Sequence, residues 1–305
     1  MKQIVIIGAK DHGEKNNTRL IADQLVSRLG PNADIKSIFW EDLLFDINAK
    51  SQTVSDKTSG FSLVQADLVI AFNWYQNDSK RIFRDVAYTL GLYLDRRGVE
   101  FWNREMVKQR STTKLSATML LALEGFDIPA SLFSLDAKNL LGHTHKYPLI
   151  VKSVSASRGR DNHLVKDHED LKKLLAGADT INRFVIQEYI PNSGDLRIIC
   201  FGGEPKIVIR RQRIDDSTHL NNTSRGARAD LLLPESLGDK LTKDCKTICE
   251  LMGRDIAGID LIGVNDGLSR QVYLEVNAIP QLTTGAFVDE KFNALATALQ
   301  DYLKR

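Results

Sequence analysis

Apolar residues recur along the chain with two different periods, and their order predicts the architecture. Near the N-terminus, a continuous apolar run at residues 3–7 predicts a buried strand, and further strands are expected near 35–39 and 67–72. Between the first two, Ile21, Leu25 and Leu29 recur at helical spacing before a Gly30-Pro31 stop. Strand and helix in alternation are typical of a parallel, three-layer α/β unit.

The middle of the chain predicts a second unit, which begins near Asn103. A helix expected at 79–97 precedes this boundary and belongs to the first unit. The helix expected at 112–124 should turn one apolar face inward, formed by Leu115, Met119, Ala122 and Leu123. Lys114 lies one residue from that face and would, taken alone, be a solvated surface lysine.

An apolar strand at 147–152 runs directly into Lys152. An ammonium group at the end of a buried strand has a natural partner in a phosphate, and the small residues of the loop 153–162 could fold over that phosphate with their backbone amides. Ordinary loop chemistry explains the serines of this loop equally well. A helix capped by Asp167 follows, with Leu171, Leu174 and Leu175 inward.

The last third predicts an antiparallel sheet and two helices. Strands are expected at 184–190, 195–201 and 205–210, the last two forming a hairpin across Gly202-Gly203. A helix at 240–252 should bury Leu241, Cys245, Ile248, Cys249 and Met252, and a final helix is expected at 291–303.

The stretch 256–281 combines strand patterns with candidate metal ligands. Asp260 interrupts an apolar run, where an uncompensated carboxylate would cost several kcal/mol. In the next strand, Glu275 and Asn277 should share one face, opposite Val272, Leu274 and Val276. A Glu-x-Asn pair alone is usually a solvated outer face, but convergence with Asp260 favours a magnesium site that takes its other ligands from water and phosphates.

Composition and charge argue against several classes of function. The 305 residues carry a net charge of +2 without a long basic block, which argues against a broad nucleic-acid-binding surface. The three cysteines form no Cys-x-x-Cys pair and are expected as reduced core thiols of a cytoplasmic protein. No export signal or membrane span is expected. The glycines at 8 and 13 lack the spacing of a dinucleotide-binding turn.

Taken together, the motifs between Lys114 and Gln281 resemble the ATP-grasp ligases, and within them the RimK-like carboxylate–amine ligases. The segments that carry the resemblance occur in the family's order: Pro-Leu-Ile-Val-Lys152, Gln187-Glu188-Tyr189-Ile190, Gly194-Asp195-Leu196-Arg197, Asn222 to Gly226, Ala-Gly-Ile-Asp260 and Glu275-Val276-Asn277. Each motif alone is weak, whereas the ordered set is specific.

The resemblance implies a role for each matching residue. Lys114 and Lys152 would contact ATP phosphates, Gly159 would belong to the lid loop, and Asp195 would lie near the ribose. The other implied roles are adenine binding in the hinge by Gln187, Glu188, Tyr189 and Ile190, and magnesium binding by Asp260, Glu275 and Asn277. Arg211 or Arg213, together with Arg225, would neutralise the transferred phosphate and the acyl group, and Asn222 would help to bind the nucleotide.

The resemblance also implies the domain order: an N-terminal Rossmann-like domain (1–105), a small ATP-grasp lobe with the lid loop (106–183) and a C-terminal lobe with the metal site (184–305). Two α+β lobes would hold ATP between them. The implied reaction joins a carboxylate, free or on a peptide tail, to an amine or amino acid through an acyl phosphate, with Mg²⁺ or Mn²⁺.

Three alternatives stay open: a dipeptide or D-amino-acid ligase, a glutathione-type ligase, and an ATP-binding regulatory module without turnover. Association of identical chains is compatible with all of them, and no nucleic-acid or membrane partner is expected. Two departures from the family pattern concern the lid, where Gly159 stands between two arginines, and Leu220-Asn221, which replaces a more polar pair.

Overall fold

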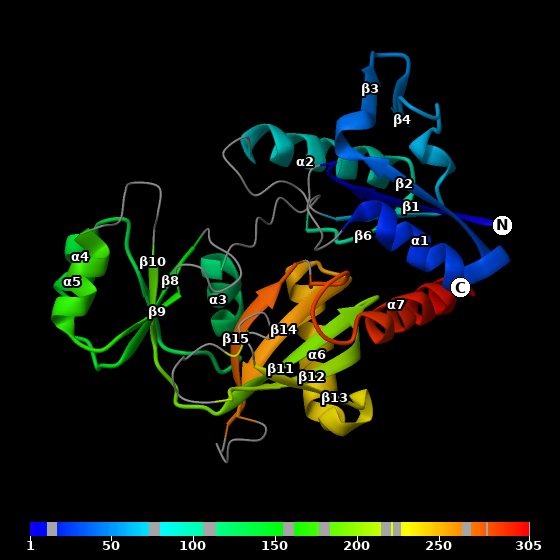
Figure 1. Cartoon of the computed structure of the whole chain (residues 1–305). Coiled ribbons are helices and arrows are strands. Elements are labelled where there is room, and N and C mark those ends of the chain that lie inside the picture. Colours follow the sequence, from blue (N-terminus) through cyan, green and yellow to red (C-terminus); the bar gives the residue numbers. More distant parts are fainter. Residues whose placement is uncertain are drawn as a thin grey trace.

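The computed structural model of the chain describes residues 1–10, 17–72, 80–105, 114–154, 162–176, 184–214, 221, 227–263, 270–278 and 280–304. These residues form three sheets of four or five strands and one two-stranded sheet. The three larger sheets mark three units, which lie in a row with the C-terminal unit in the middle (Figure 1).

The N-terminal unit is the expected parallel three-layer sandwich. Its sheet has the order β2-β1-β5-β6, and every neighbouring pair is parallel. One face of β1 packs against α1 through Ile4 and Ile6, and the other packs against α2 through Val5 and Ile7. Because both faces are covered, the strand is apolar throughout. The elements are β1 (Lys2–Gly8), α1 (Thr18–Leu29), β2 (Ala33–Phe39), β5 (Leu68–Ala71), α2 (Lys80–Arg96) and β6 (Glu100–Trp102).

A short antiparallel hairpin, β3 (Leu43–Ile47) and β4 (Gln52–Asp56), was not among the expected strands. Two of its apolar side chains, Leu44 and Ile47, are exposed. Apolar residues on both sides of a strand hide the period of two by which a half-buried strand is found.

The small lobe has an antiparallel sheet of order β7-β10-β8-β9 with two helices packed against it (Figure 1). The expected helix that follows Asp167 is present, and the Asp167 carboxylate accepts a hydrogen bond from the Asp170 amide at 2.9 Å. The elements are β7 (Ser131–Phe133), α4 (Ala137–Leu141), β8 (Leu149–Ser153), β9 (Asn162–Val165), α5 (His168–Ala176) and β10 (Phe184–Glu188).

The strand at 184–188 corrects the expected domain boundary. We expected β10 to open the third unit, but it pairs with β8 along its whole length, from Phe184 opposite Ser153 to Glu188 opposite Leu149. The connection between the two lobes therefore lies between Glu188 and Gly194. Sequence position alone could not assign β10, because an apolar strand between two sheets fits either one.

The C-terminal unit has a sheet of order β13-β12-β11-β14-β15, antiparallel throughout. All five side chains expected inward on the helix at 240–252 are buried in its core. The elements are α3 (Lys114–Leu123), β11 (Gly194–Phe201), β12 (Glu204–Gln212), β13 (Arg228–Leu232), α6 (Gly238–Met252), β14 (Ile256–Ile262), β15 (Val272–Asn277) and α7 (Val288–Leu303).

The inward face predicted for α3 is wrong. Met119 and Leu123 are 57% and 74% exposed, while Ala117 and Leu121 are buried against Tyr273 and α6. The helix packs on β15 and α6, so it belongs to the C-terminal unit although it precedes the small lobe in sequence. Leucine and methionine occur on several sides of α3, and the apolar pattern therefore does not identify the buried side.

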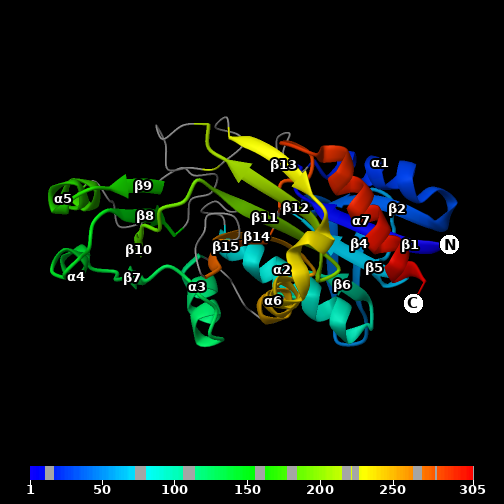
Figure 2. The same ribbon diagram turned by 90° about the horizontal axis from the view of Figure 1, so that it is seen from below.

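The N-terminal and C-terminal units share one hydrophobic core. Helix α7 lies beside α1, and residues of β1, β11, β12 and β14 meet in the same cluster (Figure 2). A polar contact reinforces this junction: Asn103 donates its amide N–H to Asp255 at 2.7 Å and accepts one from Ile256 at 2.9 Å. No helix in the described part of the chain is both long and apolar enough to cross a membrane.

Candidate active site

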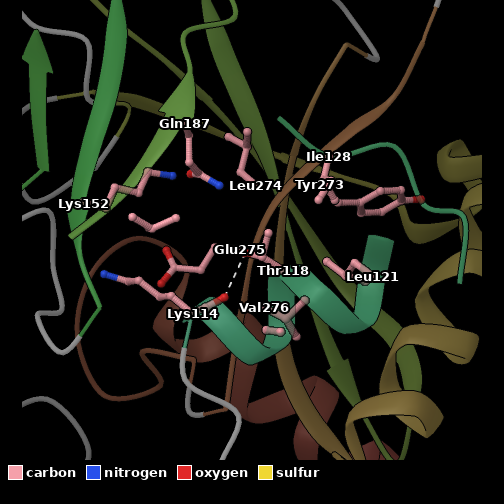
Figure 3. A pocket seen from close by; sticks show the side chains of 12 residues that line it. Lys114, Thr118, Leu121, Ile128, Lys152, Gln187, Tyr273, Leu274, Glu275 and Val276 are labelled. Carbon is pink, nitrogen blue, oxygen red and sulfur yellow. Dashed lines mark hydrogen bonds between the residues drawn. The ribbon is translucent and has the colours of Figure 1, made fainter. Parts of the chain in front are cut away.

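A cleft of about 440 Å³ opens between the small lobe and the C-terminal unit. Four of the predicted site residues line it: Lys114 on α3, Lys152 on β8, Gln187 on β10 and Glu275 on β15 (Figure 3). They come from two units and span more than half of the sequence, and folding brings them to one cavity. The rest of the lining is mostly apolar, formed by Ala117, Thr118, Leu121, Ile128, Val185, Tyr273, Leu274 and Val276.

The two lysines reach the cleft from its two sides. Lys114 is the first residue of α3 and donates from Nζ to the carbonyl of Ser153 at 3.2 Å, a contact between the C-terminal unit and the small lobe. Lys152 points into the same cavity (Figure 3). Burial lowers the pKa of Lys152, Glu275 opposes this shift, and Lys114 adds to it. The cleft therefore holds positive charge that an anionic ligand would stabilise.

The predicted hinge lies at the end of β10. Gln187 is buried and donates from Nε2 to the Ser131 hydroxyl at 2.9 Å. Glu188 is exposed, Tyr189 is half-buried, and Ile190 packs in a small cluster with Ile262 and Val272. A buried amide beside exposed polar groups suits a flat heterocycle, which needs apolar walls and a few directed hydrogen bonds.

The predicted metal ligands lie on neighbouring strands in register. Asp260 is opposite Glu275, and Gly258 is opposite Asn277. The expected alternation of β15 is partly wrong, because the register shifts between Asp260 and Leu261. As a result Val276 packs in the α6 core together with Tyr273, whereas Val272 and Leu274 join Ile190. A bulge of this kind redirects side chains, here next to Glu275.

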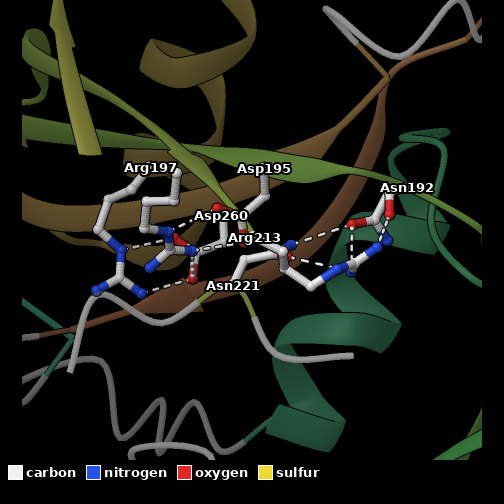
Figure 4. A network of polar contacts seen from close by, with 7 residues as sticks. Asn192, Asp195, Arg197, Arg213, Asn221 and Asp260 are labelled. Carbon is white, nitrogen blue, oxygen red and sulfur yellow. Dashed lines mark hydrogen bonds and ion pairs between the residues drawn. The ribbon is translucent and has the colours of Figure 1, made fainter. Parts of the chain in front are cut away.

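A row of ion pairs crosses the sheet from β12 to β14 (Figure 4). Arg211 binds Asp195 with two hydrogen bonds of 2.6 and 2.7 Å, and its Nη2 lies 3.1 Å from Asp260. Arg197 binds Asp260 from the other side at 2.7 and 2.5 Å. Burial alone would raise the pKa of Asp260, but the two guanidinium groups lower it to about 2. Asp260 is thus held as a carboxylate.

Arg213 lies apart from this row. It donates to the backbone carbonyl of Asn192 and, from Nη1, to the Asn221 side chain at 3.3 Å (Figure 4). Asn192 belongs to the connection between the lobes, so Arg213 ties that connection to the C-terminal unit. Gly159, Asn222 and Arg225 fall outside the described residues.

The donor set suits a hard cation. Glu275 is half-buried at the cleft, and Asn277, two residues further along β15, is also half-buried. Asp260 binds Arg197 and Arg211, yet each carboxylate oxygen keeps a further lone pair for a metal. Two carboxylates and an amide leave most positions for water and phosphate, as Mg²⁺ prefers. Among the described residues, no group of three or more His, Cys, Asp and Glu offers another metal site.

Arg197 was not assigned a role from the sequence, although it belongs to a quoted motif. It stands two residues after Asp195 on a strand, so the two side chains share one face. That alternation was the signal that could have placed it in the site. Thr118 and Leu274, which also line the cleft, carried no such signal.

Curated relatives share part of the chain. A protein of Alkalilimnicola ehrlichii named probable alpha-L-glutamate ligase is 27% identical over 189 residues, which cover 59% of this chain and 60% of that protein. A probable alpha-L-glutamate ligase 2 of Hahella chejuensis is 29% identical over 211 residues, covering 68% and 67%. The chain thus spans about 60% of the length of the first relative it matches.

Solved structures share the fold over the whole chain. The ATP-grasp ligase PsnB, complexed with a minimal precursor, superposes with a TM-score of 0.68 at 15% identity and covers 100% of both chains. The D-alanine–D-alanine ligase of Bacillus anthracis, complexed with ATP, gives 0.64 at 16% identity and covers 100% and 98%. The model of a RimK-like ATP-grasp domain matches residues 111–299, more than half of the sequence, and the chain belongs to this family.

Proposed function

We propose that the chain is an ATP-dependent carboxylate–amine ligase that forms an amide through an acyl phosphate and releases ADP and phosphate. One observation carries the proposal: the cleft that contains Lys114, Lys152 and Gln187 ends at Glu275, whose strand neighbour Asp260 begins the row of ion pairs. The site proposed for the nucleotide and the charged site proposed for the reacting carboxylate would therefore lie next to each other.

ATP would lie between the lobes, with its base at the hinge and its phosphates toward Glu275. Gln187 to Ile190 would contact adenine, Asp195 would face the ribose side, and Lys114 and Lys152 would hold phosphate oxygens. The buried ammonium of Lys152 is disfavoured in the empty cleft and would regain stability beside a phosphate. Closure of the small lobe would exclude water from the reacting groups.

The carboxylate substrate would approach on the side of Arg197 and Arg211. Two anions repel strongly in a dry site, and fixed guanidinium groups lower this barrier without reorganising. Asp260, Glu275 and Asn277 would hold Mg²⁺, or Mn²⁺ in its place, and the ion would supply the remaining positive charge near the phosphates. By resemblance to the family, Arg213 and Arg225 would help to neutralise the transferred phosphate and the acyl group.

The names of the curated relatives support glutamate as one substrate. The acceptor class is open between a free amino acid and a peptide tail, and PsnB, a fold neighbour, was solved with a precursor peptide. Buried, unpaired cysteines fit a cytoplasmic enzyme. A dipeptide, D-amino-acid or glutathione-type ligase differs only in substrate, whereas a regulatory module would bind ATP without turnover.

Trapping the acyl phosphate tests the proposal. With ATP, Mg²⁺ and L-glutamate, hydroxylamine should intercept the mixed anhydride and yield glutamyl hydroxamate, even without the natural amine. ADP should form in the same amount. AMP as the product would indicate an adenylating enzyme, and nucleotide binding without ADP release, across a panel of acids, would favour the regulatory module. The Arg211→Ala variant should lose hydroxamate formation by at least about tenfold while retaining ATP binding.

A further inference from the structure

Lys291 is a buried cation that the proposed chemistry leaves unexplained. It lies in the first turn of α7, on the side that also buries Phe292 and Leu295, and is only 3% exposed. A lysine at such a position loses hydration, and the positive end of the helix dipole disfavours its charge further. No carboxylate in the described part of the chain forms an ion pair with it in return.

Its partners are two carbonyl groups of one loop. Nζ donates to Gln281 at 2.9 Å and to Thr284 at 3.1 Å, so Lys291 closes residues 280–285 into a compact turn. The Gln281 side chain also donates to the Thr284 hydroxyl. Two of the three ammonium hydrogens are thereby used.

The loop 280–285 continues the strand of the predicted metal ligands. It starts three residues after Asn277, and Pro280 lies so close to β14 that a side chain at Gly258 would meet it at 3.3 Å. The loop is thus packed directly against the strand that carries Asp260.

Few charged groups of the described residues act on Lys291. Burial lowers its pKa to about 8, Arg197 on β11 acts in the same direction, and the exposed Glu290 opposes it. On the side of α1, Arg28 is paired with Asp289 at 3.1 Å. Lys291 and Arg197 are therefore close enough to repel each other, and a negatively charged ligand near both would offset their repulsion.

We infer that Lys291 is a positioning residue for the acid substrate: it holds the loop 280–285 against β14, so that the loop and Arg197 receive the substrate carboxylate. The inference rests on the proposed function. It assigns the loop to the acid substrate and leaves ATP to the cleft. A neutral side chain could fill the volume that the Lys291 side chain occupies. Only a positively charged side chain, however, adds to the positive electrostatic potential of Arg197.

Kinetics of Lys291→Met and Lys291→Arg test this role, with L-glutamate, ATP and Mg²⁺ as the probe and ADP release as the signal. Lys291→Met should raise KM for glutamate about tenfold and leave KM for ATP within about twofold. Lys291→Arg should restore much of the loss. Lys304→Met, at the exposed end of the same helix, should match the wild type.

The pH dependence adds a readout that a purely structural lysine would not give. Because Lys291 is charged below about pH 8 and neutral above it, kcat/KM for glutamate should fall in the wild type as pH rises through this value. The fall should be absent in Lys291→Met and in Lys291→Arg. An unchanged KM for glutamate and an unchanged profile in Lys291→Met would overturn the inference.

Hydrogen exchange separates this inference from the proposed function. Amides of residues 281–287 should exchange faster in Lys291→Met than in the wild type, with or without substrates. Faster exchange, together with no ADP release by any variant or by the wild type, would support the hold of Lys291 on the loop and contradict the ligase. Equal exchange rates in Lys291→Met and the wild type would show that Lys291 does not hold the loop in place.

Discussion

Arg197 and Asp260 face each other on neighbouring strands and are joined by two parallel hydrogen bonds of 2.7 and 2.5 Å. Asp260 in turn lies opposite Glu275, which lines the cleft proposed for ATP. The pair therefore links the side of the sheet proposed for the acid substrate to the side proposed for ATP. Its fork-to-fork geometry fixes both side chains more firmly than a single contact would.

Removal of Arg197 should therefore affect both stability and turnover. Arg197→Met leaves the buried Asp260 with Arg211 alone, and we expect the free energy of unfolding in urea to fall by about 2 kcal/mol. The turnover rate should also fall, and by a larger factor than the decrease in the folded fraction alone would cause. Arg228→Met is the control, because Arg228 is mostly exposed beside Asp230 and should change stability by less than about 1 kcal/mol. Equal effects of the two changes would show that the Arg197 pair is a surface contact in energetic terms.

Glu275→Gln tests the metal site without changing the size of the side chain. Loss of one carboxylate should lower magnesium-dependent turnover by orders of magnitude and shift the dependence on Mg²⁺ to higher concentration. The melting temperature should change little, since Glu275 is half-buried at the cleft. Undiminished turnover would remove Glu275 from the site.

Lys152→Met should stabilise the empty protein and weaken ATP binding. Burial disfavours the charged form of Lys152, so its removal relieves that cost at neutral pH. The difference in stability should shrink as pH rises toward the ordinary pKa of lysine, because the wild type then folds with a neutral amine. Calorimetry with and without ATP measures both effects. Lys146→Met, an exposed lysine of the same lobe, should change neither.

A pair of alanine substitutions tests the packing of α3. Leu121→Ala should cost about 2–4 kcal/mol of unfolding free energy, since Leu121 is 2% exposed in the core. Leu123→Ala should cost less than about 0.5 kcal/mol because that side chain is 74% exposed. A larger loss for Leu123→Ala than for Leu121→Ala would instead support the inward face that the sequence predicts for this helix.

The sequence predicted elements well where one apolar period was clear. Helix α6 was found with all five inward residues because polar residues fill its other side. Helix α3 was misread because leucines surround it, and β10 was given to the wrong unit because an apolar strand carries no sign of its partner. Tertiary packing, and not the local sequence pattern, decides which side of a helix is buried and which sheet a strand joins.

Some features of the site could likewise be predicted from the sequence, and others could not. Lys114, Lys152 and Glu275 were predicted from motifs, and the structure brings them to one cleft. The pairing of Arg197 with Asp260 joins residues 63 positions apart and depends on strand register, which no local pattern reveals. The bulge beside Glu275 depends on the same register.

The attachment of the small lobe has a consequence for how such enzymes diversify. Helix α3 and strand β11 both belong to the C-terminal unit, so the chain leaves that unit after Leu123 and returns to it at Gly194. The intervening segment is an insertion with both ends anchored in one body. It carries Lys152 and Gln187, whereas Asp260 and the loop after Asn277 stay with the body. Substitutions within this inserted segment can therefore change the contacts proposed for the nucleotide base without altering the residues of the body that are proposed to bind the acid.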